Sequence, residues 1–130
     1  MDFMDFNNVA WILFSNLEQN NNLKMANQWG IPRETEEFVI KRDLCCVYCG
    51  VDFSINHQSR KTRPSWEHIV NDIRINSIDN IALCCTCCNA SKGAKNLTDW
   101  LKSNYCLSKN INENTVAEVV KNAIINPPLY

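Results

Sequence analysis

The feature that most constrains this chain is a set of Cys-x-x-Cys turns that lie far apart in the sequence. The first turn is Cys46 to Cys49, and in the second both Cys84/Cys87 and Cys85/Cys88 have the same spacing. Tetrahedral zinc needs four soft ligands, which two such turns supply while they close a long loop. Spacing alone does not choose the second pair. Because four thiolates leave no open position for a substrate, we expect a structural site.

The eight cysteines would also suit a secreted disulfide scaffold. The apolar run from Val9 to Phe14, however, is only six residues long and has acidic flanks, unlike a signal peptide. Paired cysteine spacing without an export signal favours metal over disulfides, and we expect a reducing, cytoplasmic compartment. No apolar stretch approaches the length of a membrane span, so no membrane partner is expected.

Length and charge indicate one domain with a basic central region. A chain of 130 residues with 45% hydrophobic content can bury one core but hardly two. The formal net charge of -1 does not suggest a nucleic-acid partner. The charge is segregated along the chain. The charged residues up to Ile40 are mainly acidic, whereas Arg60, Lys61 and Arg63 form a purely basic stretch. An anion-binding face is therefore expected in the central and later parts.

Hydrophobic periodicity predicts helices at both ends and short strands between them. The expected helices cover residues 8–19, 33–44, a short segment after Asn89 that breaks near Gly93, 97–105, and 116–124 behind a Thr115–Glu118 capping box. The expected strands are residues 64–70 and 81–83. We therefore divide the single domain into a helical cover (1–40), a zinc-stapled core (41–105) and a C-terminal helical part (106–130). The terminal helices could form a homodimer.

Four motifs, in their order along the chain, resemble the zinc-containing branch of the HNH endonuclease family. They are Arg42 to Gly50, Trp66-Glu67-His68-Ile69-Val70, Asn80 to Leu83, and Cys85 to Asn89 followed by Lys92-Gly93. The resemblance covers about residues 40 to 100. Each motif alone is weak evidence for the resemblance, but the four motifs in this order are specific to the family.

The resemblance implies an α+β fold with a small ββα-metal core and a zinc ribbon. It implies that Glu67 and Asn89 bind a divalent metal, that His68 is the general base, and that Asn80 pins the hairpin loop. It also selects Cys85 and Cys88 as the partners of Cys46 and Cys49 at the zinc, and makes DNA the expected substrate. Glu67 departs from the commonest form of the family, which has aspartate there.

The residue types suit this chemistry. Histidine can take a proton from water near neutral pH, and carboxylate and amide oxygens suit Mg²⁺ or Mn²⁺. On a regular strand Glu67 and His68 point to opposite faces, so only a bulge would bring both to one phosphate. Asn89 could instead cap a helix. Lys92 and Lys95 are expected where a phosphate backbone would run, and Arg60, Lys61 and Arg63 could also bind phosphates.

We therefore expect a metal-dependent DNA endonuclease with structural zinc. The alternative is a non-catalytic zinc-ribbon module that binds nucleic acid or protein, in which Glu67, His68 and Asn89 are incidental. The Glu67-His68 pair favours the nuclease, since a binding module has no need of it.

Overall fold

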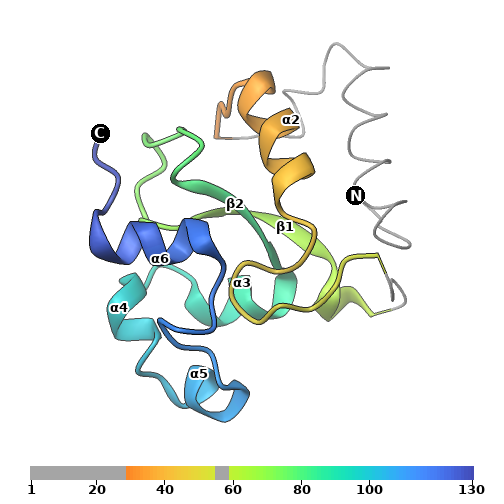
Figure 1. Ribbon diagram of the computed structural model, residues 1–130, viewed down its shortest axis with the longest axis vertical. Coiled ribbons are helices and arrows are strands. Elements are labelled where there is room, and N and C mark those ends of the chain that lie inside the picture. The colour runs from red at the N-terminus through yellow and green to blue at the C-terminus, as the bar shows by residue number, and fades with distance from the viewer. Residues whose placement is uncertain (1–28, 55–58) are drawn as a thin grey trace.

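The computed structural model describes residues 29–54 and 59–130 (Figure 1). The helix expected over residues 8–19 lies outside them. The described part combines helices with one small antiparallel sheet, which confirms the α+β class.

The central element is a β-hairpin. Strand β1 (Pro64–His68) pairs with β2 (Ile81–Cys85) in a register that runs without a bulge from Pro64 opposite Cys85 to His68 opposite Ile81. Every residue of β2 is buried, as expected for a strand covered on both faces. The strands thus lie where the sequence predicted them, although β1 is shorter and β2 longer.

Helix α3 (Thr86–Lys92) follows β2 with no loop between them. It begins before Asn89 rather than after it, because the second Cys-x-x-Cys turn is itself the first helical turn and the Cys85 sulfur accepts a hydrogen bond from the Cys88 amide. Gly93 ends the helix with a φ of 51°, a conformation that glycine adopts at little cost. The helix packs against both strands and against the short 3-10 helix η2 (Arg60–Thr62).

Helix α2 (Arg33–Arg42) packs on β2 and ends earlier than the predicted residue 44. The cause is Asp43, whose buried carboxylate accepts a hydrogen bond from the Leu83 amide at 3.0 Å and forms an ion pair with Arg42 at 2.6 Å. Asp43 therefore fastens the end of α2 to the second strand of the hairpin.

The C-terminal part holds helices α4 (Leu97–Trp100), α5 (Asn104–Lys109) and α6 (Glu118–Ile125). The single helix predicted over 97–105 is wrong, because Ser103 caps a new helix by accepting a hydrogen bond from the Cys106 amide. The predicted capping box is also wrong. Thr115 instead accepts a hydrogen bond from the Asn112 amide in the preceding turn, and α6 starts at Glu118.

One hydrophobic core joins these elements. It is formed by residues of both strands, the first cysteine turn and the helices, with Tyr48, Phe53, Ile69 and Trp100 among its largest buried side chains. Within the described residues, no helix has the length and apolarity that crossing a membrane requires.

Candidate functional site

Four cysteines form a cluster that could hold a metal ion such as zinc. The sulfurs of Cys46, Cys49, Cys85 and Cys88 all lie within 4.8 Å of one another. Among the described residues this is the one group of three or more Cys, His, Asp or Glu side chains close enough to share an ion. Four converging sulfurs are the donor set of structural zinc, and the second pair is Cys85/Cys88 rather than Cys84/Cys87.

Both halves of the cluster use the same local geometry. The Cys49 amide lies 3.4 Å from the Cys46 sulfur, and the Cys88 amide lies 3.4 Å from the Cys85 sulfur. Gly50 follows the first turn with a φ of 79°, a conformation that glycine adopts at little cost. The Val47 amide donates to the Leu83 carbonyl, so the first turn is tied directly to β2.

The close packing of the sulfurs shifts the pKa of Cys46, Cys49 and Cys88. Hydrogen bonds from the neighbouring thiols, Cys46 first, lower the pKa of Cys49 far below its usual range. Burial raises the pKa of Cys46, and the hydrogen bond with Cys46 raises that of Cys88. Because thiolates and not thiols bind metals, a divalent cation held by the four sulfurs would favour their deprotonation.

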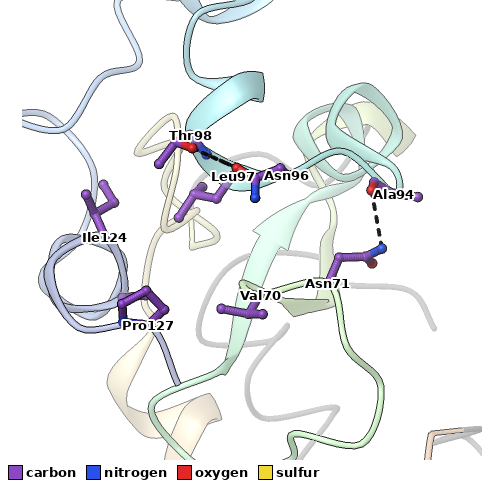
Figure 2. Close-up of a pocket in the computed structure, with 9 residues that line it drawn as sticks. Val70, Asn71, Ala94, Asn96, Leu97, Thr98, Ile124 and Pro127 are labelled. Carbon is purple, nitrogen blue, oxygen red and sulfur yellow. Dashed lines mark hydrogen bonds between the residues drawn. The ribbon is translucent and has the colours of Figure 1, made fainter. Parts of the chain in front are cut away.

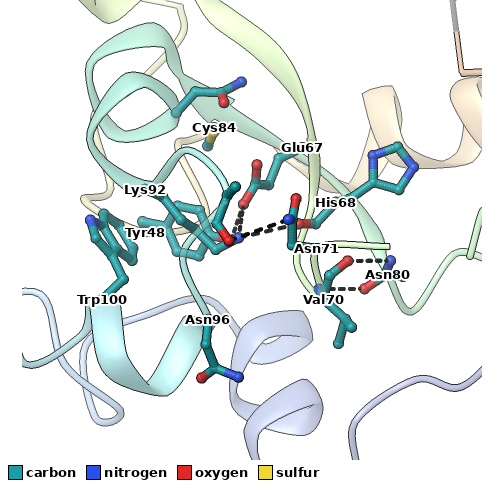
Figure 3. Close-up of polar contacts among 12 residues, drawn as sticks. Tyr48, Glu67, His68, Val70, Asn71, Asn80, Cys84, Lys92, Asn96 and Trp100 are labelled. Carbon is teal, nitrogen blue, oxygen red and sulfur yellow. Dashed lines mark hydrogen bonds and ion pairs between the residues drawn. The ribbon is translucent and has the colours of Figure 1, made fainter. Parts of the chain in front are cut away.

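Glu67 points into the core from β1 (Figure 3). Its Oε2 accepts a hydrogen bond from the Tyr48 hydroxyl at 2.5 Å and forms an ion pair with Lys92 Nζ at 2.9 Å. The Lys92 side chain is only 1% exposed, and its ammonium also donates to the His68 carbonyl at 3.3 Å. Lys92 was predicted to lie where a phosphate backbone would run, but it is buried instead, and its charge is compensated by Glu67.

His68 points to the opposite face of β1 from Glu67, as regular strand geometry requires (Figure 3). Its Nε2 lies 2.8 Å from Oδ1 of Asn76, and the ring of Trp29 approaches it edge-on with a centroid distance of 5.8 Å. His68 is 7% exposed. The structure therefore separates the two side chains that the resemblance assigns to one phosphate.

The two predicted asparagines both make structural hydrogen bonds. Asn80 is fully buried; it accepts from the Val70 amide at 2.7 Å and donates to the carbonyls of Val70 and Ile75. It therefore holds the loop between the strands closed, the geometry expected of it. Asn89 lies within α3 and donates to the Ser65 hydroxyl and the Trp66 carbonyl, which ties the helix to β1.

The basic residues lie at both ends of α3. Arg60 and Lys61 are on η2, where Lys61 is exposed, and Arg63 is half-buried. The Thr86 amide at the start of α3 donates to the Arg63 carbonyl, so this basic stretch lies beside the start of the helix. Lys95 is exposed just beyond the other end of the helix.

The divalent metal that the resemblance implies does not fit the residues as they are placed. The Glu67 carboxylate is already shared by a buried ammonium and a buried hydroxyl. A cation on Glu67 would lie close to the ammonium of Lys92, and like charges in a buried site repel strongly. Mg²⁺ and Mn²⁺ also retain several waters when they bind, which a carboxylate that is 5% exposed does not accommodate readily.

A pocket of about 440 Å³ lies between α4, α6 and the segment that follows β1 (Figure 2). Asn71 donates to the Ala94 carbonyl at one side of it, and Leu97 and Ile124 line the other side. None of its lining residues is titratable or could ligate a metal through a carboxylate, imidazole or thiolate.

The sequence alone assigned no role to Tyr48, Asn76 or Trp29. Tyr48 had a usable signal, because a tyrosine inside a buried cysteine turn needs a hydrogen-bond partner for its hydroxyl. Asn76 lies in an asparagine-rich loop with nothing to distinguish it. Comparison with known proteins finds no matching family model, curated protein or solved structure.

Proposed function

We propose that this chain is a DNA endonuclease that hydrolyses phosphodiester bonds with His68 as its general base, on a fold fastened by structural zinc. The proposal is supported by a hairpin followed directly by a helix, with the four-cysteine cluster at their junction and His68 at the far end of β1. The ordered motifs of the HNH family supply the choice of reaction and of DNA as substrate.

The observation that carries the proposal is the hydrogen bonding of the His68 ring. Asn76 Nδ2 lies 3.2 Å from the Trp29 carbonyl, and a carbonyl can only accept, so the amide nitrogen must face it. Asn76 therefore presents its oxygen to His68 Nε2 at 2.8 Å, and that ring nitrogen must carry the hydrogen. In the neutral ring Nδ1 then holds the lone pair, which is the atom able to accept a proton from water.

The test is cleavage of supercoiled plasmid by zinc-loaded protein in Mg²⁺ or Mn²⁺, with His68→Ala compared with wild type. The chain has two histidines, so His57→Ala is the matched control. We expect His68→Ala to lower the rate by about 10²–10⁴-fold, the usual contribution of a general base, and His57→Ala to leave it unchanged. A His68→Ala protein that cleaves as fast as wild type would remove His68 from the mechanism.

DNA binding by the basic residues is tested separately from cleavage. Replacing Arg60, Lys61 and Arg63 by glutamine should weaken binding and reduce the slope of log affinity against log salt by about 0.9 for each phosphate that the protein no longer neutralises. Lys109→Gln is the control, because it removes a positive charge outside the basic stretch, on α5, where Lys109 lies over the ring of Tyr105. If the slope of log affinity against log salt does not change, Arg60, Lys61 and Arg63 do not contact DNA phosphates.

A second function is favoured by the burial of the polar residues. Glu67 has Lys92 and Tyr48 as partners, and Asn89 is bonded to Ser65, so each has a structural role without any reaction. A non-catalytic zinc module that binds nucleic acid or protein would need no more than this. Folded, zinc-containing protein that binds DNA but cleaves it in neither metal would favour the module.

A further inference from the structure

The group that carries a further inference is the buried set of Glu67, Lys92 and Tyr48, which the proposed reaction does not use (Figure 3). We infer that Lys92 supplies, through its ammonium, the positive charge that balances Glu67, and that Glu67 is therefore a positioning residue and not a metal ligand. This inference does not depend on whether the chain cleaves DNA.

The first argument is the way in which Lys92 is held. Its ammonium makes an ion pair with Glu67 Oε2 at 2.9 Å and a hydrogen bond to the His68 carbonyl at 3.3 Å, and its side chain is only 1% exposed. Lysine is almost never buried this completely unless its ammonium is paired with an anion. Lys92 is also the last residue of α3, where the helix dipole favours a cation.

The second argument is the occupation of the carboxylate. The Tyr48 hydroxyl and the Lys92 ammonium meet at the same oxygen, Oε2. Burial raises the pKa of Tyr48, with the charge of Glu67 the next cause, so the phenol stays a neutral donor to that oxygen. A divalent cation would have to displace Lys92 or share one carboxylate with it.

The third argument is what the set does for the strand. Lys92 joins the end of α3 to β1 at two successive residues, through the side chain of Glu67 and the carbonyl of His68. Tyr48 adds the first cysteine turn to the same oxygen. The set therefore fixes the backbone from which the His68 side chain projects to the opposite face.

The experiment uses Mn²⁺ as a paramagnetic probe on the full, zinc-loaded wild-type chain, without DNA. Thiolates bind zinc far more strongly than Mn²⁺, so the cysteine cluster stays occupied by zinc. In ¹H–¹⁵N spectra we expect no selective broadening of the amide signals of Glu67, His68 and Lys92. Selective broadening of these signals at one equivalent of Mn²⁺ would overturn the inference.

Variants extend the test to the role of Lys92. Glu67→Gln should leave the Mn²⁺ affinity of the chain within about 2-fold of wild type. A decrease of about 10-fold or more would show that Glu67 is a metal ligand. Lys92→Ala removes the ammonium and opens space for the waters that Mn²⁺ retains, so it should create a new Mn²⁺ site that disappears in the Glu67→Gln/Lys92→Ala double variant. A folded Lys92→Ala protein with no gain in Mn²⁺ binding would show that Lys92 is not what excludes the metal. If Lys92→Ala does not fold, the wild-type spectra still decide the inference.

Discussion

The ion pair between Lys92 and Glu67 provides the sharpest stability prediction. Both side chains are almost completely buried, at 1% and 6% exposure, so solvent screens neither charge. Lys92→Met would leave the Glu67 carboxylate buried with only the Tyr48 hydroxyl as partner. Removing one partner of a buried pair costs about 3–5 kcal/mol, because the remaining charge is uncompensated.

The assay is urea unfolding of zinc-loaded protein followed by tryptophan fluorescence. With an m-value of about 2 kcal/mol/M, a decrease of about 4 kcal/mol in the free energy of unfolding moves the midpoint by about 2 M. Lys95→Met is the matched control, since Lys95 is exposed just beyond the same helix, and should change stability by no more than about 0.5 kcal/mol.

The double variant separates the ion pair from simple packing. Glu67→Gln/Lys92→Met removes both charges while leaving an oxygen for the Tyr48 hydroxyl, so it should cost less than the sum of the two single changes. A Lys92→Met cost no larger than that of Lys95→Met, or single effects that add without coupling, would refute the reasoning.

Three other predictions concern the cysteines and Asn80. Cys88→Ser should lose zinc by metal analysis, because it removes a ligand, whereas Cys87→Ser should retain one equivalent; the reverse result would place the metal on the other pair. Asn80→Ala should cost about 3 kcal/mol in chemical denaturation, since it leaves buried backbone groups of the loop unpaired, and a cost below about 1 kcal/mol would contradict the role of Asn80. Cys45 is exposed, but partial desolvation of its sulfur and the nearby Asp52 carboxylate raise the pKa of its thiol, so its alkylation rate in native protein should reach a plateau at a higher pH than that of free cysteine; mass spectrometry should find buried Cys106 labelled later than Cys45 at every pH.

Local signals in the sequence predicted the parts of the fold that depend on local chemistry. The cysteine turns follow from the spacing of their ligands, and the two strands follow from the strand preference of their residues. The choice between Cys84/Cys87 and Cys85/Cys88 did not, because both have the same spacing. In the structure the choice follows from where β2 ends, since Cys85 is both the last strand residue and the residue that caps α3.

The environment of the candidate site could not be predicted from the sequence, because it depends on contacts between distant residues. Lysine is usually exposed, so nothing near Lys92 in the sequence indicates that it is buried against Glu67. The partner of Glu67 on its other side, Tyr48, comes from the first cysteine turn, and the partner of His68 comes from the loop. The break between α4 and α5 was missed because a serine inside an apolar helical pattern, Ser103, gives no sign that it caps a new helix.

The separation of the two cysteine turns has a consequence for synthesis of the chain. Cys49 and Cys85 are 36 residues apart in the sequence, and their sulfurs lie 3.7 Å from each other in the folded protein. At a translation rate of about 5–20 residues per second, the first turn leaves the ribosome roughly 2–7 s before its partner. During that interval Cys46 and Cys49 can offer a metal only two thiolates. Completion of the site therefore waits for the end of β2 and the first turn of α3, which carries Cys88, and the newly made chain has an unprotected pair of thiols for seconds in every round of synthesis.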